Sequence, residues 1–229
     1  MDSNKNNGVA TGNPTSETIN NSGTAQDIRS LEELSNYLKS SASIRQGRSI
    51  PPLEQWHPEQ TIDMDLTIKA NGEWWHEGGI MTRQSLISLF VTVLWKEENN
   101  GVTEYFLKTP VQKLRIQVED VPLFINDVGI VSEDGVNWLE FTTVAGDVVR
   151  LDDAHPIELR SYNPSDAQED VEKEQIRPYM LVRNGLMALI GRNTFYHLTE
   201  IGQLTEQGDN VILTLESGGR SYQLLMPDD

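Results

Sequence analysis

Residues 62–76 read IDMDLTIKANGEWWH, and this stretch decides how the first part of the chain folds. From Ile62 to Lys69 apolar residues alternate with polar ones, a period of two that predicts a half-buried β-strand. Asn71-Gly72 follows the strand. This pair predicts a two-residue type I′ hairpin turn, because both residues tolerate the positive φ that such a turn requires.

The predicted turn also fixes which side chains share a face of the hairpin. With a two-residue loop, Ile68 lies opposite Trp75, so we expect Trp75 on the buried face. Trp74 and His76 then belong to the outer face, because neighbouring strand residues point in opposite directions.

A helix and two more strands complete the first half. The helix is expected to begin after Thr82 and to run to about Trp95, with apolar residues around most of its circumference. Strands near 102–108 and 111–118 follow the turn at Asn99-Asn100-Gly101. The first half therefore has the predicted order β-β-α-β-β.

The second half has the same predicted order if the strand at 147–151 or the one at 156–160 is taken together with the strand at 178–183. Its predicted strands lie near 123–131, 137–144, 147–151, 156–160 and 178–183, and a helix near 185–200 precedes a hairpin at 210–216 and 219–225. The expected fold class is α+β, with two tandem β-β-α-β-β-type halves and mainly antiparallel sheets.

Composition divides the rest of the chain. Residues 1–25 are polar and nearly free of apolar side chains, which predicts a disordered tail. Residues 26–50 are expected to form a short helix and a linker. Residues 51–120 form the first predicted α+β repeat and residues 121–229 the second.

The short helix has an apolar face of its own. Its members are Ile28, Leu31, Leu34 and Leu38, and the candidate N-caps are Asp27 and Ser30.

Charge and cysteine content exclude several classes of function. The net charge is −17, and residues 51–229 carry 30 acidic and 13 basic side chains. An acidic body repels phosphate backbones and anionic lipid surfaces, so we expect neither a nucleic-acid nor a membrane partner. The chain has no cysteine and no apolar run near its start, and a cytoplasmic protein is expected.

A series of short motifs occurs in a fixed order between residues 50 and 202. They include Trp56-His57-Pro58, Gly72-Glu73-Trp74-Trp75-His76-Glu77-Gly78, Val118-Glu119-Asp120-Val121-Pro122 and Arg177-Pro178-Tyr179. In these motifs the chain resembles domain-of-unknown-function family 1285 (DUF1285), a family of uncharacterised proteobacterial proteins. It departs from the family pattern at Gly79, where proline is usual, and at Gln112, where glutamate is usual.

The resemblance implies a fold and suggests a role. It implies tandem repeats of a small sheet with a helix, each similar to part of a pleckstrin-homology-like domain. It also suggests a role in signal transduction. The implied fold agrees with the two halves inferred from the residues.

His76, Asp63 and Asp65 are the best candidates for a metal or acid–base site, since one face of the predicted hairpin carries all three. A closed zinc site needs about four ligands, and no further nitrogen or sulfur ligand lies nearby. We therefore expect a solvated histidine–carboxylate pair, with no bound metal and no cofactor.

Trp74 and a group of arginines are the candidates for a binding surface. An exposed Trp often marks such a surface, although a second packed layer could cover Trp74, and we favour that alternative. The cationic candidates are Arg177, Arg183 and Arg192, with Tyr179 on the same strand face as the first two. Guanidinium groups suit phosphate or carboxylate, but pairing with internal carboxylates such as Glu172 or Glu200 is the alternative that we favour.

No catalytic motif is present: the sequence has no phosphate-binding glycine loop, nucleophile elbow or dinucleotide fingerprint. We therefore assign no catalytic residue and expect a non-catalytic binding or regulatory module for a protein partner or a small anionic ligand. The alternative is an enzyme that uses His76 and a neighbouring carboxylate in a cleft between the halves. A cavity that encloses His76, Asp63 and Arg83 would favour the enzyme.

Overall fold

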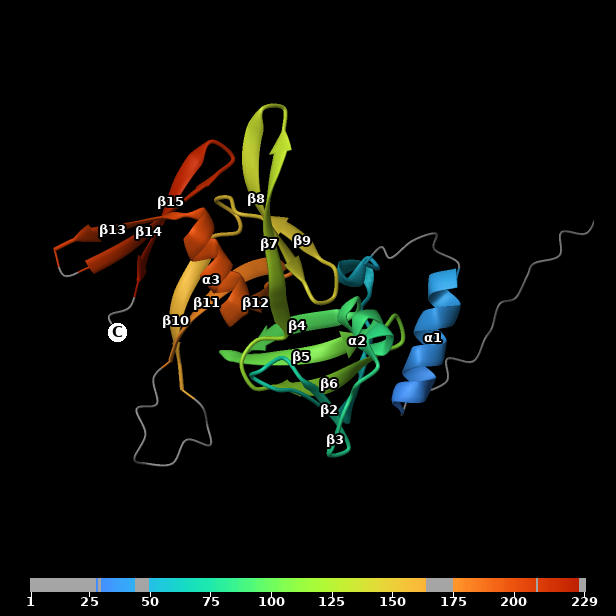
Figure 1. Cartoon of the computed structure of the whole chain (residues 1–229). Helices are drawn as coiled ribbons and strands as arrows, with labels where there is room; N and C mark the ends of the chain where they lie inside the picture. The colour runs from blue at the N-terminus through green and yellow to red at the C-terminus, as the bar shows by residue number, and fades with distance from the viewer. Residues whose placement is uncertain (1–27, 29, 44–49, 164–174, 209, 227–229) are drawn as a thin grey trace, which may run out of the picture.

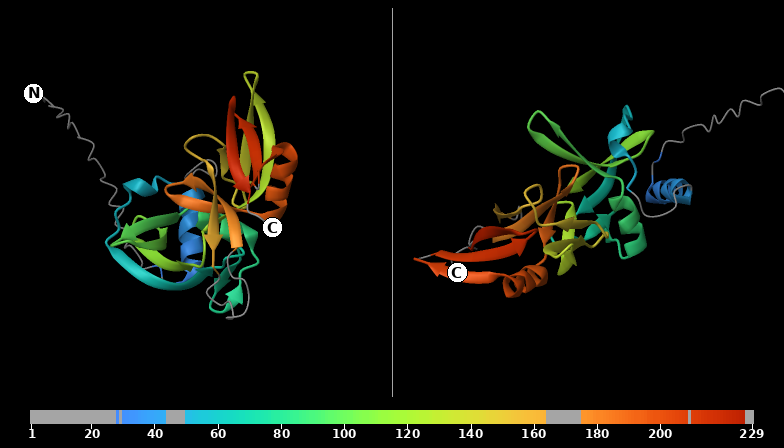
Figure 2. Two further views of the ribbon diagram at one scale, coloured as in Figure 1. Left: turned by 90° about the vertical axis from the view of Figure 1, so that its left-hand side faces the viewer. Right: turned by 90° about the horizontal axis from the view of Figure 1, so that it is seen from above.

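The structure is a computed structural model, and it describes residues 28, 30–43, 50–163, 175–208 and 210–226. Two units lie side by side, with helix α1 (Leu31–Ser43) at one end of the molecule and a small third sheet at the other (Figures 1 and 2). The predicted disordered tail, residues 1–25, lies outside the described residues. Among those described, no helix has the length and apolar character needed to cross a bilayer.

The first unit is a six-stranded mixed sheet with one helix. A short 3-10 helix, Leu53–Gln55, precedes it. Its elements are β1 (Gln60–Ile68), β2 (Trp74–His76), β3 (Gly79–Ile80), α2 (Gln84–Val91), β4 (Leu94–Asn99), β5 (Val102–Lys108) and β6 (Gln112–Val118). The strand order is β3-β2-β1-β6-β5-β4, in which β1 and β6 are parallel and the other neighbours antiparallel.

The second unit is also a six-stranded mixed sheet, and a three-stranded sheet follows it. Its elements are β7 (Leu123–Glu133), β8 (Val136–Thr143), β9 (Val148–Arg150), β10 (Ile157–Tyr162), β11 (Gln175–Arg183), β12 (Leu186–Ile190), α3 (Arg192–Ile201), β13 (Gln203–Gln207), β14 (Asn210–Ser217) and β15 (Arg220–Met226). The strand order is β10-β11-β12-β7-β8-β9, with β12 and β7 parallel, and β13-β14-β15 form the small sheet.

The two six-stranded sheets have the same strand order when each is numbered from its own first strand. In both, the first and sixth strands are parallel neighbours at the centre. The α+β class is confirmed, but the β-β-α-β-β order is wrong in detail. Each unit has six strands, and the helix follows the third strand in the first unit and the sixth strand in the second.

Two strands, β4 and β12, lie where the sequence predicts the end or the start of a helix, because short apolar runs fit a buried helix as well as a strand. The helix expected to reach Trp95 ends at Val91, and β4 begins at Leu94. Asn100 and Gly101 have φ of 52° and 79°. Positive φ at both positions makes a tight hairpin between β4 and β5, and the pairing draws the preceding residues into a strand.

A turn with two positive φ values also explains why β12 replaces the start of the second predicted helix. Residues 186–190, expected at the start of a helix, form β12. Asn184 and Gly185 have φ of 47° and 73°, so they join β11 to β12 as a hairpin. Helix α3 starts only after Gly191, where an added Cβ would lie 2.9 Å from the Phe124 ring.

The β1–β2 hairpin is real, but its register is not the predicted one. Asn71 is not among the residues with positive φ, whereas Gly72 has φ of +85°. The Lys69 N–H donates to the Glu73 carbonyl, so the loop has three residues rather than two. A change of one residue in the loop moves every side chain of one strand to the opposite face.

The register change exchanges the two tryptophans. Ile68 pairs with Trp74, not with Trp75. Trp74 is therefore buried, with 4% exposure, and its ring centroid lies 6.4 Å from that of Phe90. The prediction that Trp75 faces the core and Trp74 faces outward was wrong. Trp74 is buried, as the favoured alternative expected, but the cause is its place on the inner face and not a second layer over the outer one.

Helix α1 packs as its apolar face predicts. Leu31, Leu34 and Leu38 are buried, and the Ser30 hydroxyl accepts the Glu33 N–H at the helix start. The preceding residue Ile28 is bound by Gln112, whose amide donates to the Ile28 carbonyl at 2.5 Å and accepts its N–H at 3.0 Å. Gln112 is fully buried. One side chain therefore ties the segment before α1 to the sheet.

Replacing Trp74 with Ala should lower the free energy of unfolding by about 3–5 kcal/mol, because it leaves a cavity in the core. Trp75→Ala should lower the free energy of unfolding by only about 1 kcal/mol, since the Trp75 ring is only partly buried. Urea denaturation followed by circular dichroism measures both. A larger loss for Trp75→Ala than for Trp74→Ala would support the two-residue loop instead.

Gln112→Glu should release the segment at Ile28, because a carboxylate cannot donate to the Ile28 carbonyl. We expect the free energy of unfolding to fall by about 2 kcal/mol, because a buried polar group is left without its partner. Hydrogen exchange in α1 should become faster. Gln117→Glu, at an exposed position of the same strand, is the matched control and should change stability by less than about 0.5 kcal/mol. Unchanged exchange in α1 would show that Gln112 does not hold the helix.

Candidate functional site

A cleft lies where the two units meet, and both units line it. Its volume is about 980 Å³, within the range of roughly 300–1,000 Å³ that is usual for ligand pockets. The β1–β2 hairpin forms one wall, and β10, β11, β12 and the start of α3 form the other. The apolar lining comprises Trp75, Phe124, Leu159, Tyr162, Ile176, Pro178, Leu189, Ile190, Phe195 and Met226.

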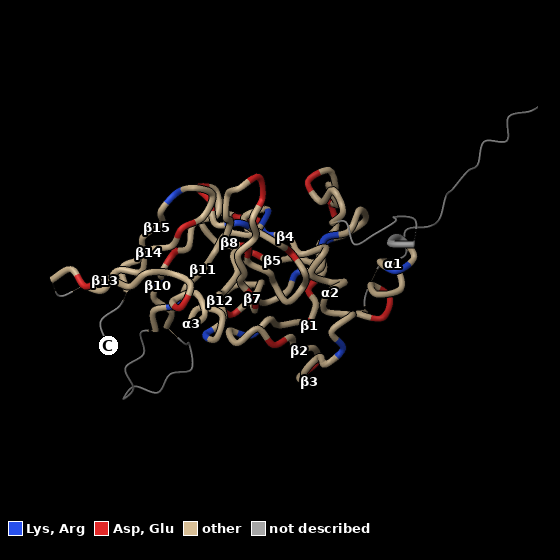
Figure 3. Tube along the Cα trace, turned by 45° about the horizontal axis from the view of Figure 1, so that its top comes forward, with Lys and Arg blue, Asp and Glu red and all other residues tan. Residues whose placement is uncertain are grey.

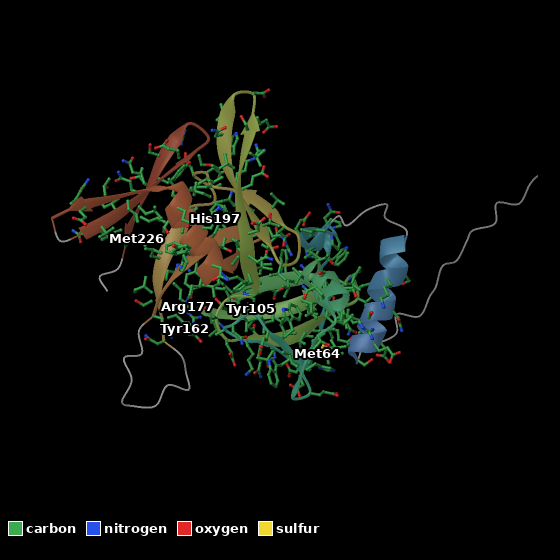
Figure 4. The ribbon with its side chains drawn as sticks, viewed as in Figure 1. Met64, Tyr105, Tyr162, Arg177, His197 and Met226 are labelled. Atoms are coloured by element: carbon green, nitrogen blue, oxygen red, sulfur yellow. The ribbon has the colours of Figure 1, made fainter. Side chains whose placement is uncertain are left out.

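Arg177 lies on the wall of this cleft but is engaged inside the protein. Its Nη1 donates to Asp120 at 2.9 Å, and its Nε and Nη2 donate to the Gln175 side chain. The guanidinium stacks 3.7 Å from the ring centroid of Tyr162, which Figure 4 labels beside it. Nη1 also donates to the Ala70 carbonyl of the first unit, at 3.3 Å. Arg177 thus joins the two units.

Tyr179 supports the same carboxylate. Its hydroxyl donates to both oxygens of Asp120, at 3.0 and 2.9 Å. Burial, together with the hydrogen bond to Asp120, raises the pKa of the Tyr179 phenol well above its ordinary value. The phenol therefore keeps its proton at neutral pH and acts as a fixed donor behind the wall of the cleft.

The wall formed by the first unit has paired polar groups as well. Lys69 donates to Glu119 at 2.6 Å, and the Ala70 N–H donates to the other oxygen of the same carboxylate. These bonds lower the pKa of Glu119, the largest contribution being the hydrogen bond from Lys69. The indole N–H of Trp75 donates to Glu73 at 3.0 Å.

Arg192 differs from the other cations at the cleft. It is the first residue of α3, it is exposed, and it makes no hydrogen bond or ion pair with any other residue that the structure describes. No side chain caps the start of α3 at Gly191. The positive end of the helix dipole therefore has the same sign as the guanidinium beside it.

Arg183 lies elsewhere, in a second cavity of about 910 Å³ between α1, α2 and residues 144–149. Its Nε donates to Asp147 at 2.9 Å and its Nη2 donates to the Val91 carbonyl at 2.6 Å. The Nη1 atom is buried without a partner among the described residues. The structure therefore brings Arg177 and Arg192 to one cleft and leaves Arg183 out of it.

His76 does not join the two aspartates. It pairs opposite Leu66, so its side chain lies on the face opposite to that of Asp65, and its Nδ1 contacts the Asp65 carbonyl oxygen at 2.6 Å. Asp63 binds Arg115 at 2.9 Å. Within the described ranges, no three His, Cys, Asp or Glu side chains lie close enough to hold a metal ion.

The remaining candidates also lie away from the cleft. Trp74 is in the core, as described above. Arg83 is exposed at the N-terminus of α2. His76, Asp63 and Arg83 line neither this cleft nor the second cavity.

Carboxylates surround the few cations. Asp and Glu residues occur along both units (Figure 3), in keeping with the net charge of −17. Among the cations that line the cleft, Arg192 is the one without a partner in the part of the chain that the structure describes, because Lys69 and Arg177 bind Glu119 and Asp120. An anion that approaches the cleft meets repulsion from most directions and attraction at Arg192.

Sequence reasoning missed most of the apolar lining and the partners of the arginines. The two-residue loop that the sequence predicts puts Trp75 in the core, whereas the three-residue loop of the structure puts it on the cleft wall. Asp120 and Asp147, which bind Arg177 and Arg183, lie 57 and 36 residues away in sequence. The Asn71-Gly72 pair also fits the end of a three-residue loop after Lys69, and that loop length puts Trp75 on the outer face.

Comparison with known proteins identifies the family. A model described as the N-terminal domain of DUF1285, a domain of unknown function, matches residues 51–121, and its C-terminal counterpart matches residues 122–224. The chain belongs to the DUF1285 family. The resemblance seen in the sequence motifs is thereby confirmed. No curated protein sequence matches the chain.

Two solved structures of DUF1285 proteins are similar. One, from Silicibacter pomeroyi DSS-3, is 31% identical, with a TM-score of 0.62, covering 82% of this chain and 94% of that one. The other, from Shewanella baltica OS155, is 26% identical, with a TM-score of 0.41, covering 60% of this chain and 91% of that one.

The two departures from the DUF1285 pattern lie outside the cleft. Gln112 holds Ile28, as described above, and glutamate at this position could not make both hydrogen bonds. Gly79 begins the short edge strand β3 and is exposed. Neither residue lines the cleft.

Arg183→Gln should lower the free energy of unfolding by about 3 kcal/mol, because it leaves Asp147 buried without its cation. The two side chains are only 12% and 11% exposed. Arg160→Gln breaks the exposed pair with Glu158 and should cost less than about 1 kcal/mol. Chemical denaturation measures both. Equal stabilities of the two variants would contradict a structural role for Arg183.

Proposed function

We propose that this DUF1285 protein is a non-catalytic binding module that holds a small anionic ligand in the cleft between its two units. The anionic group would lie at Arg192. One observation carries the proposal: both units build a concave, mainly apolar cleft, and Arg192 is the cation on its wall without a partner among the described residues.

The shape of the site favours a small ligand over a protein partner. Stable protein interfaces bury about 800 Å² on each side, whereas a concave cleft of about 980 Å³ encloses a small molecule. The acidic body also makes nucleic acid and anionic membranes poor partners. The cytoplasmic location expected from the sequence belongs to the same proposal.

The alternative of an enzyme based on His76 gains no support from the geometry. The residues that it needs, His76, Asp63 and Arg83, lie apart from both cavities. A binding module does not require these three side chains to lie close together. It requires a site that both units complete, and the cleft provides one.

A regulatory role follows from the position of the cleft. A ligand that contacts both units binds the assembled pair more tightly than separated units, and so favours one arrangement of the two. Such a protein could carry the role in signal transduction, and the pleckstrin-homology-like character, that the family resemblance suggests. Both belong to the proposal.

The dye anilinonaphthalene sulfonate (ANS) tests the proposal, because it combines one anionic group with an apolar ring system. ANS should bind the folded protein with enhanced fluorescence, and Arg192→Gln should weaken its affinity about tenfold, the value of one charge-assisted hydrogen bond. Titration at low salt measures the affinity, and added salt should reduce it.

Arg83→Gln is the matched control for this titration. Arg83 is also exposed and also lies at a helix start, but outside the cleft. Its replacement should leave ANS affinity unchanged. Equal ANS affinity in the Arg192→Gln variant and in the unaltered protein would contradict the proposal.

A further inference from the structure

Apart from Arg192, the charged groups on the wall of the cleft are engaged inside the protein, so the cleft offers few of them to a ligand. Glu73 accepts the indole N–H of Trp75, and Glu119 accepts hydrogen bonds from Lys69 and from a backbone N–H. Arg177 donates to a carboxylate, a side-chain amide and a backbone carbonyl. A sugar or a nucleotide would lose its hydrogen bonds to water here and gain few in return.

The remaining wall is apolar and comes from both units. Trp75 belongs to the first unit, and Phe124, Leu159, Phe195 and Met226 belong to the second. Methylene groups that contact these side chains leave water at no hydrogen-bonding cost. The body of a well-fitting ligand is therefore hydrocarbon.

The charge at the site limits the head group to a single negative charge. Arg192 is the cation available, and the carboxylates of Glu73 and Glu119 line the same cleft. In a protein of net charge −17, a second negative charge on the ligand would add repulsion without a second partner. A monocarboxylate meets this limit, whereas a phosphate monoester carries about −1.5 to −2 at neutral pH.

We infer that the ligand of this cleft is a free fatty acid: a monocarboxylate with an alkyl chain, its carboxylate at Arg192 and its chain against Trp75, Phe124 and Phe195. This inference rests on the proposed function and names its ligand class. It explains why the lining residues are large and apolar while one guanidinium is left unpaired.

The chain contributes to affinity in proportion to its length. Each methylene group buried in the cleft should tighten binding about fourfold, until the cleft is filled. A series of octanoate, decanoate and dodecanoate therefore gives a slope that a purely electrostatic site would not show.

Isothermal titration of the full chain with these three carboxylates, below their micelle concentrations, tests the inference. Acetate supplies the charge without the chain, decanol the chain without the charge, and decyl phosphate a second charge. Decanoate should bind about sixteenfold more tightly than octanoate, and more tightly than acetate, decanol or decyl phosphate. Arg192→Gln should weaken decanoate about tenfold, and Trp75→Ala should reduce the dependence on chain length.

The outcomes separate the ligand class from the proposed function. No increase of affinity with chain length, tighter binding of decyl phosphate than of decanoate, or equal decanoate affinity in Arg192→Gln overturns the fatty-acid inference. If ANS binding still depends on Arg192, the proposed function stands and the ligand is a different anion. If neither ANS nor decanoate responds to Arg192→Gln, both the inference and the proposed function are wrong. Circular dichroism of each variant checks that it is folded.

Discussion

The central parallel pair of strands is the constraint on which each unit depends. β1 and β6 lie side by side, as do β7 and β12, and each pair joins the first and last strands of its sheet. Parallel neighbours cannot be joined by a tight turn, so the four intervening strands must lie outside the central pair. Hairpins account for most of the remaining pairings, and the strand order is therefore the same in both units.

In this topology local contacts form the hairpins, whereas contacts between distant segments close each sheet. Hairpins such as β4–β5 and β11–β12 form from neighbouring residues, whereas closing each sheet brings together strands tens of residues apart. The latter step has the larger entropy cost. The short connection from Val118 to Leu123 then leads directly from the last strand of one sheet to the first of the next, which holds the two units side by side. Their meeting surface is where the cleft lies.

The sequence predicts the fold class, the β1–β2 hairpin and the apolar face of α1, because each depends on a periodic pattern or on a turn residue. It does not predict the loop length at Ala70-Asn71-Gly72, since Asn-Gly suits both a two-residue turn and the end of a three-residue loop. That single ambiguity moved Trp74 and Trp75 to the wrong faces. The strands before Asn100-Gly101 and after Asn184-Gly185 are not predicted, because the short apolar runs at Leu94 and at 186–190 fit a buried helix as well as a strand.

The candidate site is harder to predict than the fold, since its chemistry depends on which cations remain unpaired. Arg177, Arg183 and Arg192 are alike in sequence, yet distant carboxylates bind the first two. A guanidinium that bridges a carboxylate and a carbonyl of the other unit stabilises the meeting of the units, and one without a partner can attract a ligand. The arginines near the contact between the units thus serve both to join the units and to attract a ligand. Arg177 and Arg183 each donate to a backbone carbonyl of the first unit, and Arg192 is the cation on the cleft wall without a partner among the described residues.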